Sequence, residues 1–244
     1  MDAPDDTTTS LDATGTRILV AGATGGTGRW VLRALDGRPP TVRALTRSAD
    51  GHDRLRRLGA DEVVVGDLFD PDDARAAVED VDAVLSAVGS AGRAVLTADE
   101  FVDGTGNRNL VEAAAEAGTE AFVVESALGV GDEPASPLAT AFDLFIGPVQ
   151  RAKAEAEAAL RNAPLRHTIL RPGVLTGGPR TGLVQTAEPG ARLWGGVTRA
   201  DVAHLLAAAP FTPAAADRTL EVVSNPLLKR RAEPIDWQLP RESR

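Results

Sequence analysis

Three glycines at a regular spacing carry the clearest chemical signal in the sequence. Gly22, Gly25 and Gly28 stand three residues apart, directly after an apolar run and before a segment that favours a helix. The first glycine permits a tight turn, the second lets the backbone approach a phosphate, and the third lets helix and strand pack closely. The free N–H groups of the helix start carry partial positive charge. We therefore expect a pyrophosphate at this turn, on Gly22, Thr24, Gly25, Gly26, Thr27 and Gly28.

The end of the second expected strand indicates which dinucleotide the turn would hold. An NAD site needs a carboxylate there for the ribose hydroxyls, but the sequence has Thr46, Arg47 and Ser48. A guanidinium instead pairs with a 2′-phosphate through charge-assisted hydrogen bonds. The sequence thus favours NADP(H) over NAD(H), with Arg47 as the phosphate clamp and Arg29, in the first helical turn, as a second one. The alternative for both is a solvated arginine in an arginine-rich chain.

These residues must be positioned by strands and helices that alternate along the chain. Asp70 is expected to cap the helix that begins at Pro71, and Gly118 to end the next one in a left-handed conformation. The alternation predicts an α/β fold, a doubly wound parallel sheet of the Rossmann type with helices on both faces. Strands are predicted at 18–21, 41–46, 63–65, 83–85, 121–124, 167–170 and 219–223, and helices at 27–35, 71–78, 98–117, 151–161 and 201–209.

The ends of the chain and one glycine-rich segment differ in amino-acid composition from this core. Residues 1–15 have low hydrophobicity and are predicted to be a disordered arm. The dinucleotide-binding domain is expected to span 16–224. Within it, residues 173–198 are rich in glycine and proline and predict a small, loop-rich lid over a substrate. Residues 225–244 are expected to form a tail on the surface.

Composition limits the classes of partner and site. The 244 residues include 35 acidic and 26 basic side chains, and this net charge of −9 repels nucleic acid. The lack of cysteine and the three scattered histidines argue against a metal site. No apolar run reaches the roughly 20 residues that cross a bilayer, so we expect no membrane span and a cytoplasmic monomer or dimer. Only Lys153 and Lys229 are lysines, which is typical of either a halophilic protein or a GC-rich genome.

The motifs taken together resemble the atypical short-chain dehydrogenase/reductase superfamily. The glycine spacing is GxxGxxG rather than GxGxxG. Within the superfamily, the chain is most similar to the group of NmrA-like proteins and Rossmann-type flavin and biliverdin reductases. The resemblance covers about residues 17–223 and runs through 42–47, 65–68, 86–89, 171–173 and 198–203.

The resemblance implies places for the rest of the cofactor. Asp67 and Leu68 resemble the pair that meets the adenine, although Asp67 can equally be a turn or helix-entry residue. The adenosine half is expected to lie over the strand-end turn formed by Ser86, Ala87, Val88 and Gly89. A second turn resembles the one that borders the nicotinamide amide, with a plain strand-ending turn as the alternative; it consists of Arg171, Pro172, Gly173 and Val174.

The positions that transfer protons in this superfamily are only partly kept. Active members use a serine, a tyrosine and a lysine, the last two standing four residues apart on one helix. Ser126 and Lys153 match the serine and the lysine, and Lys153 would also hold the nicotinamide ribose, but Val149 stands at the tyrosine position. The chain has no tyrosine at all. The resemblance therefore implies Ser126 and Lys153 as catalytic candidates, with a strand-end serine and a solvated lysine as alternatives, and disfavours ketone, alcohol, epimerase and dehydratase chemistry.

Two functions of different classes fit this pattern. The first is NADPH-dependent reduction of a flavin, a quinone or a similar planar acceptor, with the proton arriving from water. Trp194 in the lid would either line the acceptor pocket or pin the lid to the core. The second is a non-catalytic NADP(H) sensor or assembly factor, as in NmrA-like proteins. His52, His167 and His204 are expected to be structural or solvated rather than catalytic.

Overall fold

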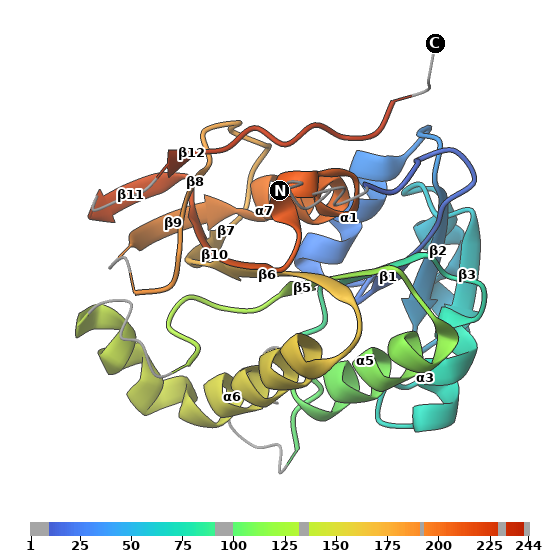
Figure 1. The fold of residues 1–244 in the computed structure, drawn as a ribbon, viewed down its shortest axis with the longest axis horizontal. Helices are drawn as coiled ribbons and strands as arrows, with labels where there is room; N and C mark the ends of the chain where they lie inside the picture. Colours follow the sequence, from blue (N-terminus) through green and yellow to red (C-terminus); the bar gives the residue numbers. More distant parts are fainter. Residues whose placement is uncertain (1–9, 91–99, 132–136, 191–192, 229–232, 242–244) are drawn as a thin grey trace, which may run out of the picture.

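The chain folds around one twisted sheet that is parallel over most of its width. The computed structural model describes residues 10–90, 100–131, 137–190, 193–228 and 233–241 (Figure 1). Within them the main sheet has the order β12-β8-β10-β6-β5-β4-β1-β2-β3, and β8 runs antiparallel to both of its neighbours. The predicted doubly wound α/β fold is confirmed. The strands are β1 (Arg17–Ala21), β2 (Thr41–Thr46), β3 (Glu62–Val65), β4 (Ala83–Ser86), β5 (Ala121–Glu125), β6 (Arg166–Pro172), β8 (Gln185–Ala187), β10 (Arg218–Val223) and β12 (Glu233–Pro234).

Helices cover both faces of this sheet and bury two apolar layers. Figure 1 shows α1 (Gly26–Leu35) and α7 (Arg199–Ala208) on one face, and α3 (Pro71–Val78), α5 (Thr105–Ala117) and α6 (Pro137–Asn162) on the other. Alternate residues of a strand point to opposite faces. Accordingly, Ile18 and Val20 pack in the layer under α1 and α7, while Leu19 packs in the other layer. The short elements are α2 (His52–Arg56) and the 3-10 turns Ala49–Gly51, Ala209–Phe211 and Pro213–Ala215.

Local signals set the helix ends where they are strong. The Asp70 side chain accepts a hydrogen bond from the Asp72 backbone N–H at 2.9 Å, and Pro71 occupies the first turn of α3. Gly118 ends α5 with φ of +73°, a conformation that costs glycine little. Both predicted caps are confirmed.

Two predicted helix starts are wrong. The helix predicted from residue 98 begins at Thr105, because the backbone at Phe101 to Gly104 forms a hydrogen-bonded turn instead; residues 98 and 99 lie outside the described part. The helix predicted from residue 151 begins at Pro137 and continues through Pro148, whose missing N–H removes one helical hydrogen bond. Among the described residues, neither this helix nor any other is long and apolar enough to cross a membrane.

The segment at 173–198, predicted to be loop-rich, contains three short strands. These are β7 (Val174–Thr176), β8 and β9 (Trp194–Thr198). β7 and β9 form a second sheet with β11 (Asn225–Leu228), in the order β11-β9-β7, whereas β8 joins the main sheet. Close approach explains one of the glycines here, since a Cβ on Gly173 would overlap the Gly195 carbonyl oxygen, whereas a Cβ on Gly177 would meet nothing within 4 Å. Short strands between glycines lack the apolar alternation by which strands are predicted from sequence.

One buried carboxylate fastens this segment to α7. Asp201 is fully buried and accepts hydrogen bonds from the backbone N–H groups of Thr181 and Gly182, both at 3.0 Å. The hydroxyls of Thr181, Thr198 and Ser224 donate to it at 2.8 to 2.9 Å. Burial by itself raises the pKa of Asp201, but the donated hydrogen bonds outweigh it and hold the pKa below its ordinary value. The carboxylate therefore stays charged and joins three separate stretches of chain.

The described parts of both chain ends lie against the core. The Leu11 backbone N–H donates to the Pro210 carbonyl at 3.3 Å, within the 1–15 segment. In the C-terminal stretch, Trp237 is buried and packs in the layer that contains α1 and α7. The Trp237 carbonyl also contacts His204 Nε2 at 2.7 Å. Residues 235–241 therefore pack on the surface of the core beside α7.

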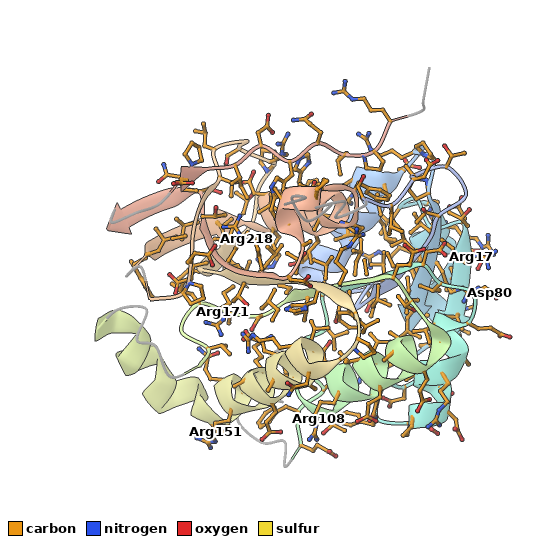
Figure 2. All side chains as sticks on the ribbon, viewed as in Figure 1. Arg17, Asp80, Arg108, Arg151, Arg171 and Arg218 are labelled. Atoms are coloured by element: carbon orange, nitrogen blue, oxygen red, sulfur yellow. The ribbon has the colours of Figure 1, made fainter. Side chains whose placement is uncertain are left out.

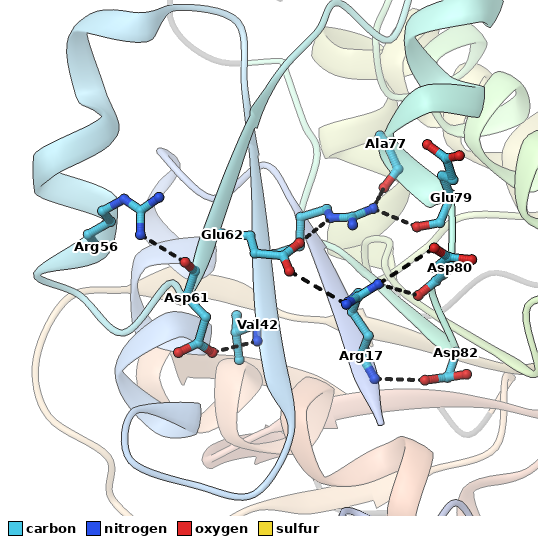
Figure 3. Close-up of polar contacts among 10 residues, drawn as sticks. Arg17, Val42, Arg56, Asp61, Glu62, Ala77, Glu79, Asp80 and Asp82 are labelled. Carbon is cyan, nitrogen blue, oxygen red and sulfur yellow. Dashed lines mark hydrogen bonds and ion pairs between the residues drawn. The ribbon is translucent and has the colours of Figure 1, made fainter. Parts of the chain in front are cut away.

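Polar contacts near the starts of β1 and β3 tie the strands together (Figure 3). Arg43 Nε lies 2.8 Å from a Glu62 carboxylate oxygen, and Arg17 Nη2 lies 3.7 Å from the other oxygen. The hydrogen bond from Arg43, opposed by burial and aided by the charges of Arg43 and Arg17, holds the pKa of Glu62 below its ordinary value. The Arg17 backbone N–H donates to Asp82 at 2.7 Å. The charged side chains at this end of the strands thus hold the strands together. The glycine turn lies at the opposite end of the sheet.

Candidate functional site

The glycine turn joins β1 to α1 and can be built only from glycine at two positions. Gly22 has φ of +74°, and a Cβ there would overlap the Ala87 carbonyl oxygen. A Cβ on Gly28 would overlap the Gly22 carbonyl oxygen. Gly25 is the N-cap of α1 and offers no side-chain hydrogen bond to the first turn. The N–H groups at the helix start are thus left for a ligand, and the turn fits a pyrophosphate.

A cleft of about 390 Å³ opens beside this turn at the carboxyl ends of the strands. It brings together many of the predicted cofactor residues, namely Gly22, Thr24, Gly25, Arg47, Asp67, Leu68, Ala87, Val88 and Gly89. Phe69 and Val102 also line it and, with Leu68 and Val88, give one wall an apolar character. An apolar wall beside a phosphate-binding turn suits the adenine of a dinucleotide.

Two of the residues predicted for the adenosine half also have structural roles. Asp67 lines the cleft, and its side chain accepts a hydrogen bond from the Phe69 N–H at 3.1 Å, which fixes the turn that the sequence had left as an alternative. Ser86 is fully buried, and its hydroxyl donates to the Asn107 side chain at 2.6 Å. Ser86 therefore supports the end of β4 from within the protein interior and does not line the cleft.

Three arginines lie near the turn, and they differ in position. Arg47 follows β2, is exposed and lines the cleft, and it has no carboxylate partner within the described residues. Arg29 lies in the first turn of α1 but is not part of the cleft wall. Arg199 begins α7, and a Cβ on Gly26 would come 2.7 Å from its Cδ and Nε. Arg199 thus covers the start of α1, where a phosphate would bind.

A buried acid connects the same helix start to Lys153. The Thr27 hydroxyl donates to a Glu125 carboxylate oxygen at 3.0 Å, and the Glu125 backbone carbonyl lies 3.5 Å from Lys153 Nζ. Burial raises the pKa of Glu125 above its ordinary value, although the charges of Lys153 and Arg199 and the hydrogen bond from Thr27 oppose the rise. Burial at the end of β5 therefore makes this carboxyl group easier to protonate than an exposed glutamate.

Lys153 is held by an ion pair that reaches the rim of the cleft. Its Nζ lies 2.9 Å from an Asp103 carboxylate oxygen, and both side chains are largely buried. The other Asp103 oxygen accepts from the backbone N–H of Ser90, which lines the cleft, at 2.6 Å. Burial by itself raises the pKa of Asp103, but the Lys153 charge and the Ser90 hydrogen bond hold it below its ordinary value. Lys153 is thus a fixed cation beside the cleft rather than a solvated lysine.

Ser126 lies deeper, in a largely buried network with three charged residues. Its hydroxyl donates to Glu157 at 2.5 Å, and the Arg171 guanidinium donates to both oxygens of the same carboxylate at 3.0 and 2.6 Å. Figure 2 shows Arg171 between the sheet and α6. Arg161 also donates to Glu157 at 2.6 Å. The Ser126 hydroxyl proton is therefore already bound within the protein, and Arg171 points away from the glycine turn toward α6.

The rest of the predicted nicotinamide turn links β6 to the second sheet. The Pro172 carbonyl accepts from the Leu128 N–H at 2.9 Å, and the Gly173 N–H donates to the Val222 carbonyl at 2.9 Å. Val174 begins β7 and is half exposed. None of the four residues at 171–174 lies in the wall of the described cleft.

The remaining candidates occupy packing positions. Val149, at the place of the family tyrosine, is buried, and Trp194 packs against Leu128. His167 Nδ1 lies 3.2 Å from Asp217. Burial lowers the pKa of His204, and the nearby Arg180 and Arg38 lower it further against the Trp237 carbonyl, so a neutral imidazole is favoured.

Several residues of this region were missed by sequence reasoning. Glu125 directly precedes Ser126, and Arg199 lies in the 198–203 motif, so both could have been suspected from their neighbours. Asp103 was hidden because it fell inside a predicted helix. Glu157 gave no signal, because it is one of several glutamates in an alanine-rich helix.

The fold and the site define a class of protein. A doubly wound sheet with a glycine turn after β1 and a cleft at the strand ends is a dinucleotide-binding Rossmann domain. A family model described as NAD(P)H-binding matches residues 22–213. The chain belongs to this NAD(P)H-binding family.

Known proteins agree with this assignment. The Bacillus subtilis protein named uncharacterized sugar epimerase YhfK is 30% identical over 193 residues, which cover 79% of this chain and 86% of that protein. A Bacillus halodurans structure named as an NAD-dependent epimerase/dehydratase is 29% identical, with a TM-score of 0.76, and covers 86% of this chain and 95% of its own. ChuY, an anaerobilin reductase of Escherichia coli O157:H7, is 28% identical with a TM-score of 0.73, covering 88% of this chain and all of its own. The resemblance to atypical short-chain dehydrogenases/reductases is confirmed.

Proposed function

We propose that this protein is an NADP(H)-dependent reductase of a flavin, a quinone or a similar planar acceptor. The observation that carries the proposal is the glycine turn together with the ion-paired Lys153. At the position of the family's proton-donating tyrosine the chain has the buried Val149. An acceptor that takes its proton from water does not need the tyrosine. The likeness to ChuY, which is named a reductase, supports this choice over the epimerase chemistry for which other relatives are named.

The residues present fit the cofactor in three parts. The free N–H groups of α1 would bind the pyrophosphate, and Arg199 over Gly26 adds a positive charge there. Arg47 would bind the 2′-phosphate, and the apolar wall of the cleft would hold the adenine. Lys153 would hold the nicotinamide ribose. When bound, the reduced nicotinamide supplies a hydride, and the protein contributes orientation and exclusion of water.

The choice of cofactor is tested by direct titration. We expect NADPH to bind more tightly than NADH, and Arg47→Ala to weaken NADPH by about ten- to a hundredfold, since a charge-assisted hydrogen bond is lost, while NADH binding stays unchanged. Arg54→Ala, an exposed arginine of α2 outside the cleft wall, is the matched control. Equal affinity of the unmutated protein for NADPH and NADH would refute the phosphate clamp.

The reductase activity is tested separately, by following NADPH oxidation with a panel of quinones and flavins. We expect steady turnover with at least one acceptor and a large loss in Lys153→Ala. Tight binding without turnover on any acceptor, together with a preference for the oxidised cofactor, would instead favour the non-catalytic NADP(H) sensor. The two assays are independent, so failure of one leaves the other interpretable.

A further inference from the structure

A second cavity, of about 370 Å³, lies between α1, α7 and the C-terminal stretch 235–241. It shares no lining residue with the cleft at the glycine turn. We name it the arginine pocket after the four arginines in its wall. The lining residues are Trp30, Arg33, Ala34, Arg38, Arg180, Ala200, His204, Gln238, Leu239 and Arg241.

The charge of the arginine pocket contrasts with that of the whole chain. The chain carries a net charge of −9, yet the described residues of the pocket wall include four guanidinium groups and no carboxylate. The pKa of the His204 ring within the wall is lowered mainly by burial; the Arg180 and Arg38 charges lower it further, while the Trp237 carbonyl and the nearby Asp236 act in the opposite direction. The pocket therefore has a local positive potential that an anion would neutralise.

Some of the four guanidinium groups are held by contacts within the protein, and others can still bind a ligand. Arg38 donates to the Ala34 carbonyl at 2.6 Å and to the Pro240 carbonyl at 3.0 Å, so it is fixed between α1 and the C-terminal stretch. Arg33 stacks 4.8 Å from the centre of the Trp30 ring. Neither Arg33 nor Arg241 has a carboxylate partner within the described residues.

Arg180 makes the one ion pair that the described residues show at this pocket. Its Nη2 lies 3.4 Å from Asp236, and both side chains are well exposed. Exposed pairs of this kind contribute little to stability. An incoming anion can therefore take over Arg180 without a large loss, because water and salt already weaken its contact with Asp236.

From this geometry we propose that the arginine pocket binds a small organic anion with at least two negative charges, of the phosphorylated or polycarboxylate class. Several guanidinium groups around one cavity favour a multivalent anion over a monovalent one, because each can donate a charge-assisted pair of hydrogen bonds. The volume lies within the range of small-molecule sites. The site is separate from the dinucleotide cleft, so the proposal does not rest on the reductase function.

The test is calorimetric titration of the full chain at constant ionic strength. The probes are citrate for polycarboxylates and fructose 1,6-bisphosphate for phosphorylated ligands, with chloride as the monovalent reference. We expect saturable binding of at least one multivalent probe and none of chloride, and the tighter probe identifies the class. Failure of both probes to bind saturably would overturn the proposal.

A matched pair of variants locates the binding. We expect Arg180→Gln combined with Arg241→Gln to weaken the probe at least tenfold, because two charged donors are lost. Arg54→Gln combined with Arg57→Gln removes the same charge from exposed positions outside both cavities and should change affinity less than twofold. Equal weakening in the two double variants would show general electrostatic attraction and would refute a site. Thermal melting of each variant confirms that it remains folded.

Discussion

Neutralising the buried carboxylate of Glu157 is expected to destabilise the fold strongly. It is 2% exposed and accepts four hydrogen bonds, two from Arg171 and one each from Ser126 and Arg161. In Glu157→Gln one oxygen becomes an NH₂ group that must face donors, and the buried Arg171 loses its counter-charge. Removing one partner of a buried ion pair costs about 3–5 kcal/mol.

For a chain of this size, that loss lowers the melting temperature by about 6–20 °C, taking roughly 2–4 °C per kcal/mol. Urea unfolding of the two proteins followed by circular dichroism measures the free-energy difference directly. The control is Glu155→Gln on the same helix, where the carboxylate is 61% exposed and lies 3.7 Å from Arg108. We expect a change of less than about 1 kcal/mol there.

The double variant Glu157→Gln, Arg171→Met separates loss of charge pairing from loss of packing. Because it removes the orphaned guanidinium as well, it should be more stable than Glu157→Gln alone. A cost below about 1 kcal/mol for Glu157→Gln, or a double variant less stable than the single one, would refute the account of Glu157 as the counter-charge of a buried arginine.

Two further predictions concern the glycine turn and the buried acid. Gly28→Ala should abolish dinucleotide binding in a fluorescence titration because its Cβ overlaps the Gly22 carbonyl, whereas Gly51→Ala, where a Cβ meets nothing within 4 Å, should bind normally; equal binding by both would contradict the steric argument. Burial raises the pKa of Glu125 above its unfolded value, so the unmutated protein loses stability as the pH rises through the range between the two pKa values, whereas Glu125→Gln cannot ionise; the variant should therefore gain in melting temperature relative to the unmutated protein as the pH rises from about 4 to 8. A difference in melting temperature that does not change with pH would mean that folding does not raise the pKa of Glu125.

The sequence was sufficient for features that depend on neighbouring residues. The turn at Gly22 to Gly28 was predictable because its glycines are required by local sterics, and the strands because buried apolar runs stand between turns. The caps at Asp70 and Gly118 are likewise set by the few residues around them. The parallel direction of most strands then followed from the alternation of strands and helices, whereas the antiparallel β8 was not predicted.

Features that depend on distant partners were not predictable in this way. The start of α6 was placed too late, because Gly147 and Pro148 break the local helical pattern although the helix continues through them. The roles expected of Ser126 and Arg171 came from their positions in motifs, whereas the fold engages both with Glu157, a contact that no spacing in the sequence encodes. The use of these residues toward a bound cofactor stays a prediction.

The carboxylate of Asp201 has a consequence for hydrogen exchange. Thr181 and Gly182 lie outside any helix or strand, where backbone amides ordinarily exchange with solvent quickly. Here both amides donate to a fully buried acceptor that is also bound by Thr198 and Ser224. Their exchange therefore requires the segment 173–198 to detach from α7. The protection factors of these two amides measure how often that detachment occurs.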